Sequence, residues 1–248
     1  MNTMYNNYKF VRKNSPLSVW HNNTFVGYFI STRLSPFFTM YFIRNNYKPN
    51  TITLLMILSG WIGAIFFAID NIFFKLVGYV FIHLWFIFDC SDGEVARLTQ
   101  TFSKMGKELD YVAHIVNHPA FGISFLISAF QFSDHASILP DIWMIILFFL
   151  LIVFNLIGRG LMSLNLIYDI RNNTTTEHNA ELTVKKLLKY IIRFFCQFPN
   201  IAILYPMLYF LDLYLDTHIS IYYIILSTFF TFGAVVIMTA NILKVFSR

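Results

Sequence analysis

The sequence predicts an all-α integral membrane protein with six transmembrane helices, preceded by an amphipathic interfacial helix. Hydrophobic residues make up 57% of the 248-residue chain and charged residues only 12%, whereas soluble domains carry about 25% charged residues. The chain also contains apolar segments near or above the roughly 20 residues with which a helix crosses the hydrocarbon core. These observations exclude an ordinary soluble domain.

The N-terminal part of the chain predicts a short helix at the membrane surface. Residues 1–32 form a polar, basic segment, and residues 33–248 form one membrane domain. We expect the helix to begin at Ser35, which is followed by a proline, and to end near Arg44. Apolar side chains such as Phe37 are available to lipid, so the helix should lie along the cytoplasmic interface.

The six predicted spans follow in order after this helix. Pro49 disfavours a helical conformation at Lys48 and so separates the first span from the preceding helix. A tight turn at Asp70-Asn71 joins the first two spans, and the long polar segment 169–186 joins the fourth and fifth. The spans cover residues 51–69, 71–88, 105–130, 143–167, 187–211 and 219–245.

Basic residues predict the orientation, because Lys and Arg favour cytoplasmic loops. Six of them precede the first span, and four more lie in the connection after the fourth span and at the start of the fifth: Lys9, Arg12, Lys13, Arg33, Arg44 and Lys48, then Arg171, Lys185, Lys186 and Lys189. The connections 131–141 and 212–218 have none. We expect both termini in the cytoplasm, no cleavable signal peptide, and a Lys75 side chain that extends to the interface.

Acidic residues directly after the second span and within the third predict a metal site. An aspartate at the bilayer centre costs about 2.5 to 3.5 kcal/mol, so Asp89, Asp92 and Asp110 need partners, most simply divalent cations. Asp89 and Asp92 are three residues apart and therefore share one helix face. Gly106, Asp110 and His114 recur at intervals of four on the next helix. The two faces can meet around one cavity.

Arginines are predicted at the same depth as these carboxylates. With a rise of 1.5 Å per residue, Asp89, Asp110, His114, Arg159 and Arg193 lie roughly 9 to 15 Å from the cytoplasmic helix ends. Carboxylates suit Mg²⁺ or Mn²⁺ and arginine suits phosphate, so the layer predicts a metal-bound phosphoryl substrate. We expect Arg159 or Arg193 to bind an acidic head group or phosphate of an acceptor. Interhelical ion pairing is the structural alternative.

The segment from Asp89 to His114 resembles the signature of the CDP-alcohol phosphatidyltransferase family, Asp-x2-Asp-Gly-x2-Ala-Arg-x8-Gly-x3-Asp-x3-Asp. The matching residues are Asp89, Asp92, Gly93, Ala96, Arg97, Gly106 and Asp110. The segment from Pro49 to Thr53 resembles the Pro-Asn-x-x-Thr opening of the family's first span. Six helices behind an interfacial helix are also the family's usual architecture.

The resemblance implies transfer of a substituted phosphate from a CDP-linked donor to an alcohol, with release of CMP, in phospholipid or surface-polymer synthesis. It implies that Asp89, Asp92 and Asp110 hold two Mg²⁺ or Mn²⁺ ions in a cytoplasm-facing site. It further implies nucleotide contacts at four positions: Gly93, Ala96, Arg97 and Gly106. A homodimer is expected by the same resemblance, and no nucleic acid partner.

His114 stands where the family has its last aspartate, which is proposed there as the base. With a reference pKa near 6.5, imidazole can accept a hydroxyl proton at neutral pH, so we expect His114 to replace that base. A catalytically impaired scaffold, a prenyltransferase with an Asp-rich motif and a transporter are alternatives. Asp110, His114 and His118 can instead form a transition-metal stripe, although the other histidines are scattered.

Overall fold

The computed structural model describes residues 10–11, 30, 32–132, 139–172, 192 and 194–246. The elements it defines within these residues are all helices: α2 (Thr32–Arg44), α3 (Pro49–Ala68), α4 (Ile72–Thr99), α5 (Gly106–Phe132), α6 (Asp141–Asn172), α8 (Phe198–Leu215) and α9 (Ile219–Phe246). Six of these helices, α3 to α6 together with α8 and α9, are long and apolar enough to cross a membrane. The predicted fold class is therefore confirmed.

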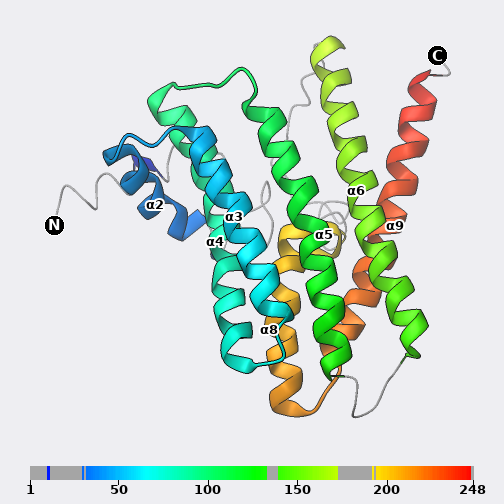
Figure 1. Ribbon diagram of the computed structural model, residues 1–248. Coiled ribbons are helices and arrows are strands. Elements are labelled where there is room, and N and C mark those ends of the chain that lie inside the picture. The colour runs from blue at the N-terminus through cyan, green and yellow to red at the C-terminus, as the bar shows by residue number, and fades with distance from the viewer. Residues whose placement is uncertain are drawn as a thin grey trace.

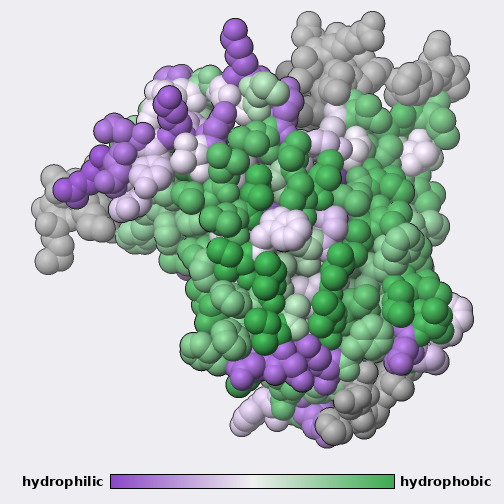
Figure 2. Space-filling model, viewed as in Figure 1, coloured by the Kyte–Doolittle hydropathy of each residue, from purple (hydrophilic) through white to green (hydrophobic). Residues whose placement is uncertain are grey.

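The surface of the helix bundle is apolar between two polar ends. Figure 1 shows the α4–α5 connection, the end of α6 and the C-terminal end of α9 at one end of the bundle, and the α3–α4 and α8–α9 turns at the other. On the face shown in Figure 2, hydrophobic side chains form a broad band between polar groups. The chain is thus an integral, multi-pass membrane protein. Which end faces the cytoplasm stays a prediction.

Helices α3 and α4 form a closely packed hairpin. The side chain of Asn71 caps α4 by accepting hydrogen bonds from the backbone nitrogens of Phe73 and Phe74, at 2.9 and 3.4 Å. At the crossing, a Cβ atom added to Gly78 would lie 2.5 Å from the backbone nitrogen of Phe67. The backbones can approach this closely only because residue 78 has no side chain. The hairpin fixes the direction in which α4 carries its acidic residues.

Helix α2 begins three residues before the predicted Ser35 and ends at the predicted Arg44. It packs on α4 through a buried face that includes Phe42, which is 3% exposed. On its other face, Leu34, Phe37 and Tyr41 are exposed. A helix thus precedes the first span, with apolar groups on its free face. Its position along the membrane surface stays a prediction.

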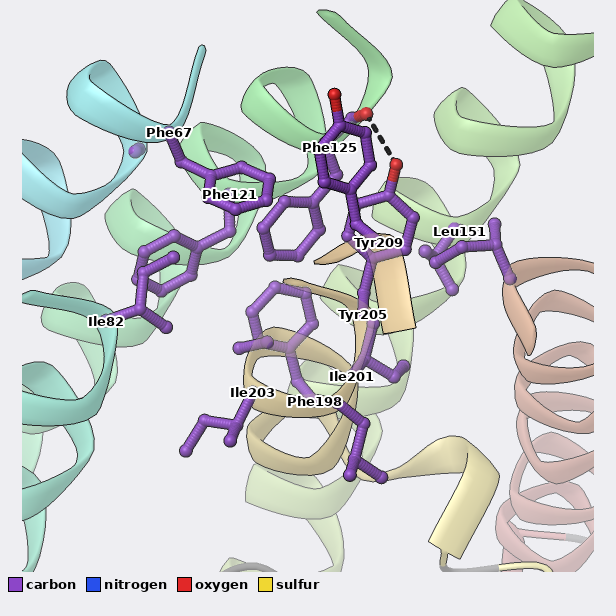
Figure 3. Packing of buried hydrophobic residues seen from close by; sticks show 14 of the residues in the cluster. Phe67, Ile82, Phe121, Phe125, Leu151, Phe198, Ile201, Ile203, Tyr205 and Tyr209 are labelled. Atoms are coloured by element: carbon purple, nitrogen blue, oxygen red, sulfur yellow. Dashed lines mark hydrogen bonds between the residues drawn. The ribbon is translucent and has the colours of Figure 1, made fainter. Parts of the chain in front are cut away.

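An aromatic core holds α8 against α3 and α5 (Figure 3). Phe67 packs edge-on against Phe125, with ring centroids 5.6 Å apart, and against Tyr205 at 6.5 Å. The Tyr205 hydroxyl donates a hydrogen bond of 3.0 Å to the backbone oxygen of Phe125. Because a buried tyrosine needs a partner for its hydroxyl, this bond fixes how α8 lies against α5. Phe198, the first residue of α8, is thereby held next to α5.

The fifth span differs from the helix predicted over residues 187–211. Helix α8 begins at Phe198, after Gln197 adopts an extended conformation with φ −78° and ψ 119°. Pro199 favours this start, since proline lacks a backbone N–H and in the first turn of a helix it removes no intrahelical hydrogen bond. The prediction of one unbroken helix through residue 197 was wrong, whereas the number of spans was right.

Helix α8 continues past the predicted end at residue 211 to Leu215 and so includes Asp212. Its buried carboxylate accepts hydrogen bonds from the backbone nitrogens of Ile219 and Ser220, both at 2.8 Å, and from the Thr217 hydroxyl at 2.7 Å. The backbone nitrogens at the start of a helix have no intrahelical partner, and a carboxylate satisfies them well. Asp212 therefore caps α9, which begins at Ile219 as predicted.

Lys75 does not extend to the interface, so that prediction was wrong. The side chain is 2% exposed, and its Nζ donates hydrogen bonds to the Phe67 backbone oxygen at 2.9 Å, the Ser128 hydroxyl at 3.0 Å and the Gln131 amide oxygen at 2.6 Å. The ring of Tyr209 lies 5.1 Å away. These acceptors replace water around the ammonium group. Lys75 joins α3, α4 and α5 at the end of the bundle where the α3–α4 turn lies.

Candidate active site

Two carboxylates and an imidazole converge between α4 and α5. His114 Nε2 lies 3.2 Å from Asp89 Oδ1 and 3.4 Å from Asp110 Oδ1. One ligand atom from each residue lies within 4.8 Å of the other two. His114 is 4% exposed, whereas the Asp110 side chain is 43% exposed, so the group opens towards one side. The predicted helix faces therefore meet at these three residues.

The connection between α4 and α5 sets the position of this group. Helix α4 continues unbroken through the motif and ends at Thr99, followed by Gln100 with the left-handed φ of 54°. Asn50 of α3 contacts this connection, because its side-chain amide donates a hydrogen bond of 3.0 Å to the Ser103 hydroxyl. A Cβ atom added to Gly106 would meet Ser103 Cβ at 3.5 Å, an ordinary contact. The protein itself thus does not require glycine at position 106.

Asp92 lies one turn further along α4 and is held from α3. The Thr53 hydroxyl donates a hydrogen bond of 2.7 Å to Asp92 Oδ2. Asp92 is not among the three residues whose ligand atoms converge. Thr53 was not predicted as a partner of Asp92, although it ends the Pro-Asn-x-x-Thr segment. The carboxylate of Asp92 is consequently fixed from a second helix.

Gly93 and Arg97 lie against each other on α4. A Cβ atom added to Gly93 would be 3.0 Å from Arg97 Nη1, so the guanidinium covers the glycine. Arg97 Nε is buried and has no hydrogen-bond partner among the residues that the structure describes. Ala96 is half-buried one turn after Asp92. Gly93, Ala96 and Arg97 thus lie near the C-terminal end of α4. The Arg97 guanidinium packs against the same helix that carries Asp89 and Asp92.

Arg159 of α6 reaches the edge of the acidic group. Its Nη2 lies 3.8 Å from Asp110 Oδ2, with 29% of the Arg159 side chain exposed. A third helix therefore contributes to the layer, and one cation partly balances two nearby carboxylates. Arg193, which was predicted to lie in the same layer, falls outside the described residues.

Glu94 was not assigned from the sequence and faces away from the acidic group. It is 1% exposed, and its two carboxylate oxygens accept hydrogen bonds from the Ser35 hydroxyl at 3.0 Å and the Thr39 hydroxyl at 2.7 Å. Both hydroxyls belong to α2. The same helix that carries Asp89 and Asp92 thus uses its opposite side to hold α2. No sequence pattern indicated this pairing.

A second histidine lies behind His114. The distance from His114 Nδ1 to His118 Nε2 is 3.2 Å, and His118 is 3% exposed. The ring of His118 stacks on Phe198 of α8, with centroids 3.7 Å apart and an interplanar angle of 16°. Because His118 directs Nε2 at His114, the two imidazoles do not converge on one ion. This argues against a transition-metal stripe along α5.

The three converging residues suit a divalent cation. Carboxylate oxygens are the preferred ligands of Mg²⁺ and Mn²⁺, and imidazole nitrogen is also a ligand for Mn²⁺. Asp89 and Asp110 both lie close to one imidazole nitrogen. Two neighbouring carboxylates repel each other, and a bound cation would offset that repulsion. The arrangement therefore fits metal binding by its donor atoms and by its charge.

Comparison with known proteins agrees with the motif. The family model for CDP-alcohol phosphatidyltransferase matches residues 46–240, which include all six spans except the last residues of α9. A search of curated proteins finds no match. Enzymes of the matching family generally use a divalent metal, and they transfer a phosphatidyl group from a CDP-alcohol to an acceptor. The chain described here belongs to the CDP-alcohol phosphatidyltransferase family.

Proposed function

We propose that this protein is an active transferase that moves a substituted phosphate from a CDP-linked donor to an alcohol and releases CMP, in phospholipid or surface-polymer synthesis. The observation that carries the proposal is the convergence of Asp89, Asp110 and His114 within 4.8 Å. Such a group in an otherwise apolar bundle has a structural cost, and intramembrane ionisable residues usually serve function. The family match supports the same reaction class.

The proposed metal ligands are Asp89, Asp92 and Asp110, which would hold two Mg²⁺ or Mn²⁺ ions. Such ions would supply positive charge that stabilises the negative charge developing as CMP leaves. Asp92 would contribute from a fixed position, because Thr53 donates a hydrogen bond to one of its oxygens. Two carboxylates on one helix and one on the next would thus hold the ions.

The donor nucleotide is proposed to lie along the end of α4 and the start of α5. Gly93, Ala96 and Gly106 present little or no side chain there, so a ligand can approach the helix backbones. Arg97, whose guanidinium covers Gly93, is proposed to turn towards the donor's phosphates. The buried Nε of Arg97 supports this role, since a phosphate oxygen would provide the partner that the described residues do not.

His114 is proposed as the general base. The alcohol's hydroxyl proton moves to His114 Nε2, the oxygen forms a bond to the donor phosphorus, and the bond between that phosphorus and CMP breaks. Nε2 is the nitrogen that faces Asp89 and Asp110, so it lies on the side where the phosphate would be held. A hydroxyl placed beside that phosphate is within reach of the same nitrogen.

Arg159 is proposed to bind an acidic group of the acceptor. Its contact with Asp110 at 3.8 Å is long for an ion pair, and 29% of its side chain is exposed, which supports a role in binding an anion. The same role is proposed for Arg193 from its predicted depth alone. We further propose that the site and both termini face the cytoplasm, as the basic loops predict, and that the protein forms a homodimer.

The reaction is tested with purified protein in lipid. Labelled CDP-diacylglycerol, CDP-ethanolamine and CDP-polyols are each incubated with a panel of alcohols and Mn²⁺, and CMP is measured. We expect one donor class to release CMP only when a matching alcohol is present. Metal-dependent binding of CDP without CMP release from any pair would instead support a catalytically impaired scaffold. Turnover of a prenyl diphosphate in place of every CDP donor would contradict the proposal.

A further inference from the structure

A buried asparagine, Asn117, joins three helices behind the acidic group of Asp89, Asp110 and His114. It lies on α5 three residues after His114, and its side chain has no exposed surface. We infer that Asn117 is a positioning residue. Through Trp85 of α4 it sets the register of α4 against α5, and this register brings the carboxylate of α4 to those of α5. The role rests on the proposed function, in which the acidic group binds a divalent metal.

The amide of Asn117 makes one hydrogen bond to each of two neighbouring helices. Its Oδ1 accepts from Trp85 Nε1 at 3.0 Å, and its Nδ2 donates to the Ile57 backbone oxygen at 3.2 Å. The chemistry of the partners fixes this orientation, because an indole nitrogen only donates and a backbone oxygen only accepts. Asn117 therefore holds α4 and α3 at the same time.

The backbone of α3 leaves room for this amide at Gly60. A Cβ atom added to Gly60 would lie 2.7 to 2.8 Å from the outer atoms of the Asn117 side chain, closer than real Cβ atoms approach their neighbours. A larger residue at position 60 would therefore displace the amide or separate the two helices. The fit of Gly60 to Asn117 leaves the amide one position between α3 and α4.

Trp85 connects this amide to the acidic group. It lies four residues before Asp89, so the two residues are neighbours on one side of α4. With a rise of 1.5 Å per residue, they are about 6 Å apart along the helix. The buried Trp85 ring also meets the His114 imidazole edge-on, with centroids 5.8 Å apart and an interplanar angle of 88°. The same indole thus donates to Asn117 and contacts the acidic group.

The geometry of the acidic group depends on the register of two helices. His114 Nε2 lies 3.4 Å from Asp110 on its own helix and 3.2 Å from Asp89 on α4. The first distance stays within α5, whereas the second crosses from α5 to α4. A slide of α4 along α5 would therefore remove Asp89 from the group. The bond between Asn117 and Trp85 opposes this slide, because it joins the same two helices one turn away.

Stability alone does not account for an asparagine inside this apolar bundle. Hydrogen bonds between membrane helices contribute little to stability on average, because separated helices also find polar partners. A fully satisfied polar contact instead selects one arrangement of a core that apolar side chains can fill in several ways. A leucine at position 117 would occupy similar space and would leave α4 free to shift against α5.

The first test removes the amide and measures metal binding. Asn117→Leu keeps a similar volume and loses both hydrogen bonds. Its Mn²⁺ affinity, measured by titration calorimetry on the full chain in lipid, should fall by at least about 10-fold, as for outer partners of metal ligands. Asn155→Leu is the matched control and should bind Mn²⁺ like the parent, because the buried Asn155 amide donates at 2.8 Å to Leu151 within its own helix, α6. A parent-like affinity in Asn117→Leu would overturn the positioning role.

A double substitution separates positioning from stability. Asn117→Leu alone leaves the Trp85 N–H buried without its acceptor, and Trp85→Phe removes that donor. The double variant should therefore melt closer to the parent than Asn117→Leu does, while its Mn²⁺ affinity stays low. An affinity that recovers together with the melting temperature would show that the contact serves stability only, and would overturn the inference.

A glycine substitution replaces Asn117→Leu if that variant fails to fold. Gly60→Ala displaces the amide and removes no polar group, so it should also lower the Mn²⁺ affinity. Gly233→Ala, with nothing within 4 Å of the added Cβ atom, is its control and should bind Mn²⁺ like the parent. A parent-like affinity in Gly60→Ala would count against the positioning role in the same way.

Asp110→Asn distinguishes a failure of this role from a failure of the proposed metal site. If Asp110→Asn binds Mn²⁺ as tightly as the parent, the proposed metal site is wrong and the role of Asn117 is overturned with it. If Asp110→Asn loses Mn²⁺ and Asn117→Leu retains it, only the positioning role is overturned. Loss of Mn²⁺ affinity in both variants, with parent-like binding in Asn155→Leu, is the expected result.

Discussion

Thr53 on α3 donates its hydroxyl hydrogen to the carboxylate of Asp92 on α4 across 2.7 Å. The bond connects the opening of the first span to the acidic motif on the second, 39 residues later in the chain. It holds one oxygen of the Asp92 carboxylate from a neighbouring helix. The position of a proposed metal ligand therefore depends on a residue outside the motif.

Thr53→Val should weaken metal binding more than it weakens the fold. The substitution keeps the shape of the side chain and removes the donor, so the Asp92 carboxylate loses its orientation. We expect Mn²⁺ affinity, measured by titration calorimetry, to fall by about 10- to 100-fold, as for other partners of metal ligands. Thr228→Val removes a buried intrahelical hydroxyl bond on α9 and should leave the affinity unchanged. Equal affinities in the parent and Thr53→Val would show that Asp92 needs no support from α3.

Glu94→Ala should loosen α2 from the bundle. The hydroxyls of Ser35 and Thr39 would then be buried without their carboxylate acceptor. Each buried polar group left unsatisfied costs about 1–3 kcal/mol, so the melting temperature of the protein in detergent should fall. Glu108→Ala, in an exposed glutamate at the start of α5, should melt like the parent. An unchanged melting temperature for Glu94→Ala would mean that α2 is held by its apolar face alone.

Gly78→Ala should destabilise the α3–α4 hairpin. The added Cβ atom would lie 2.5 Å from the Phe67 backbone nitrogen, so the two helices would have to separate. Overpacking of this kind typically costs about 1–3 kcal/mol. Gly233→Ala on α9 is the matched control, because nothing lies within 4 Å of its added Cβ, and alanine favours a helix by up to about 1 kcal/mol. Thermal unfolding of both variants should give shifts of opposite sign. A parent-like Gly78→Ala would refute the close crossing.

Arg159→Ala should affect the acceptor alcohol more than the CDP-linked donor. Loss of a charge-assisted hydrogen bond to an acidic acceptor costs about 1.5–3 kcal/mol, which corresponds to a rise of about 10- to 100-fold in acceptor KM. Steady-state kinetics with each substrate varied in turn measures the two KM values. Arg44→Ala, at the end of α2, is the control and should change neither. A larger rise in donor KM than in acceptor KM would assign Arg159 to the nucleotide side.

Hydropathy and helical spacing predicted most of the fold and the centre of the site. Six spans followed from apolar length, and the shared helix face of Asp89 and Asp92, like that of Asp110 and His114, followed from spacings of three and four. Both are properties of one helix at a time. Such properties depend only on periodicity, which the sequence displays directly.

Contacts between helices were beyond the reach of the same reasoning. The bonds from Thr53 to Asp92 and from Ser35 to Glu94 depend on how far each helix slides and rotates against its neighbour. Lys75 was expected to extend to the interface. The acceptors that bind its ammonium group lie on other helices, so the sequence did not reveal them. The start of α8 was missed for a local reason: Pro199 was hidden in a long apolar run, although it signals a first turn.

The most direct test of the shared metal site is titration calorimetry of CDP into the purified protein, with and without Mn²⁺, for the parent and for Asp110→Asn. Asp141→Asn, at the exposed start of α6, is the control. The account predicts that the parent and Asp141→Asn bind CDP only when Mn²⁺ is present, and that Asp110→Asn loses this binding. Equal CDP binding by the parent with and without the ion, or by Asp110→Asn and the parent, would contradict it.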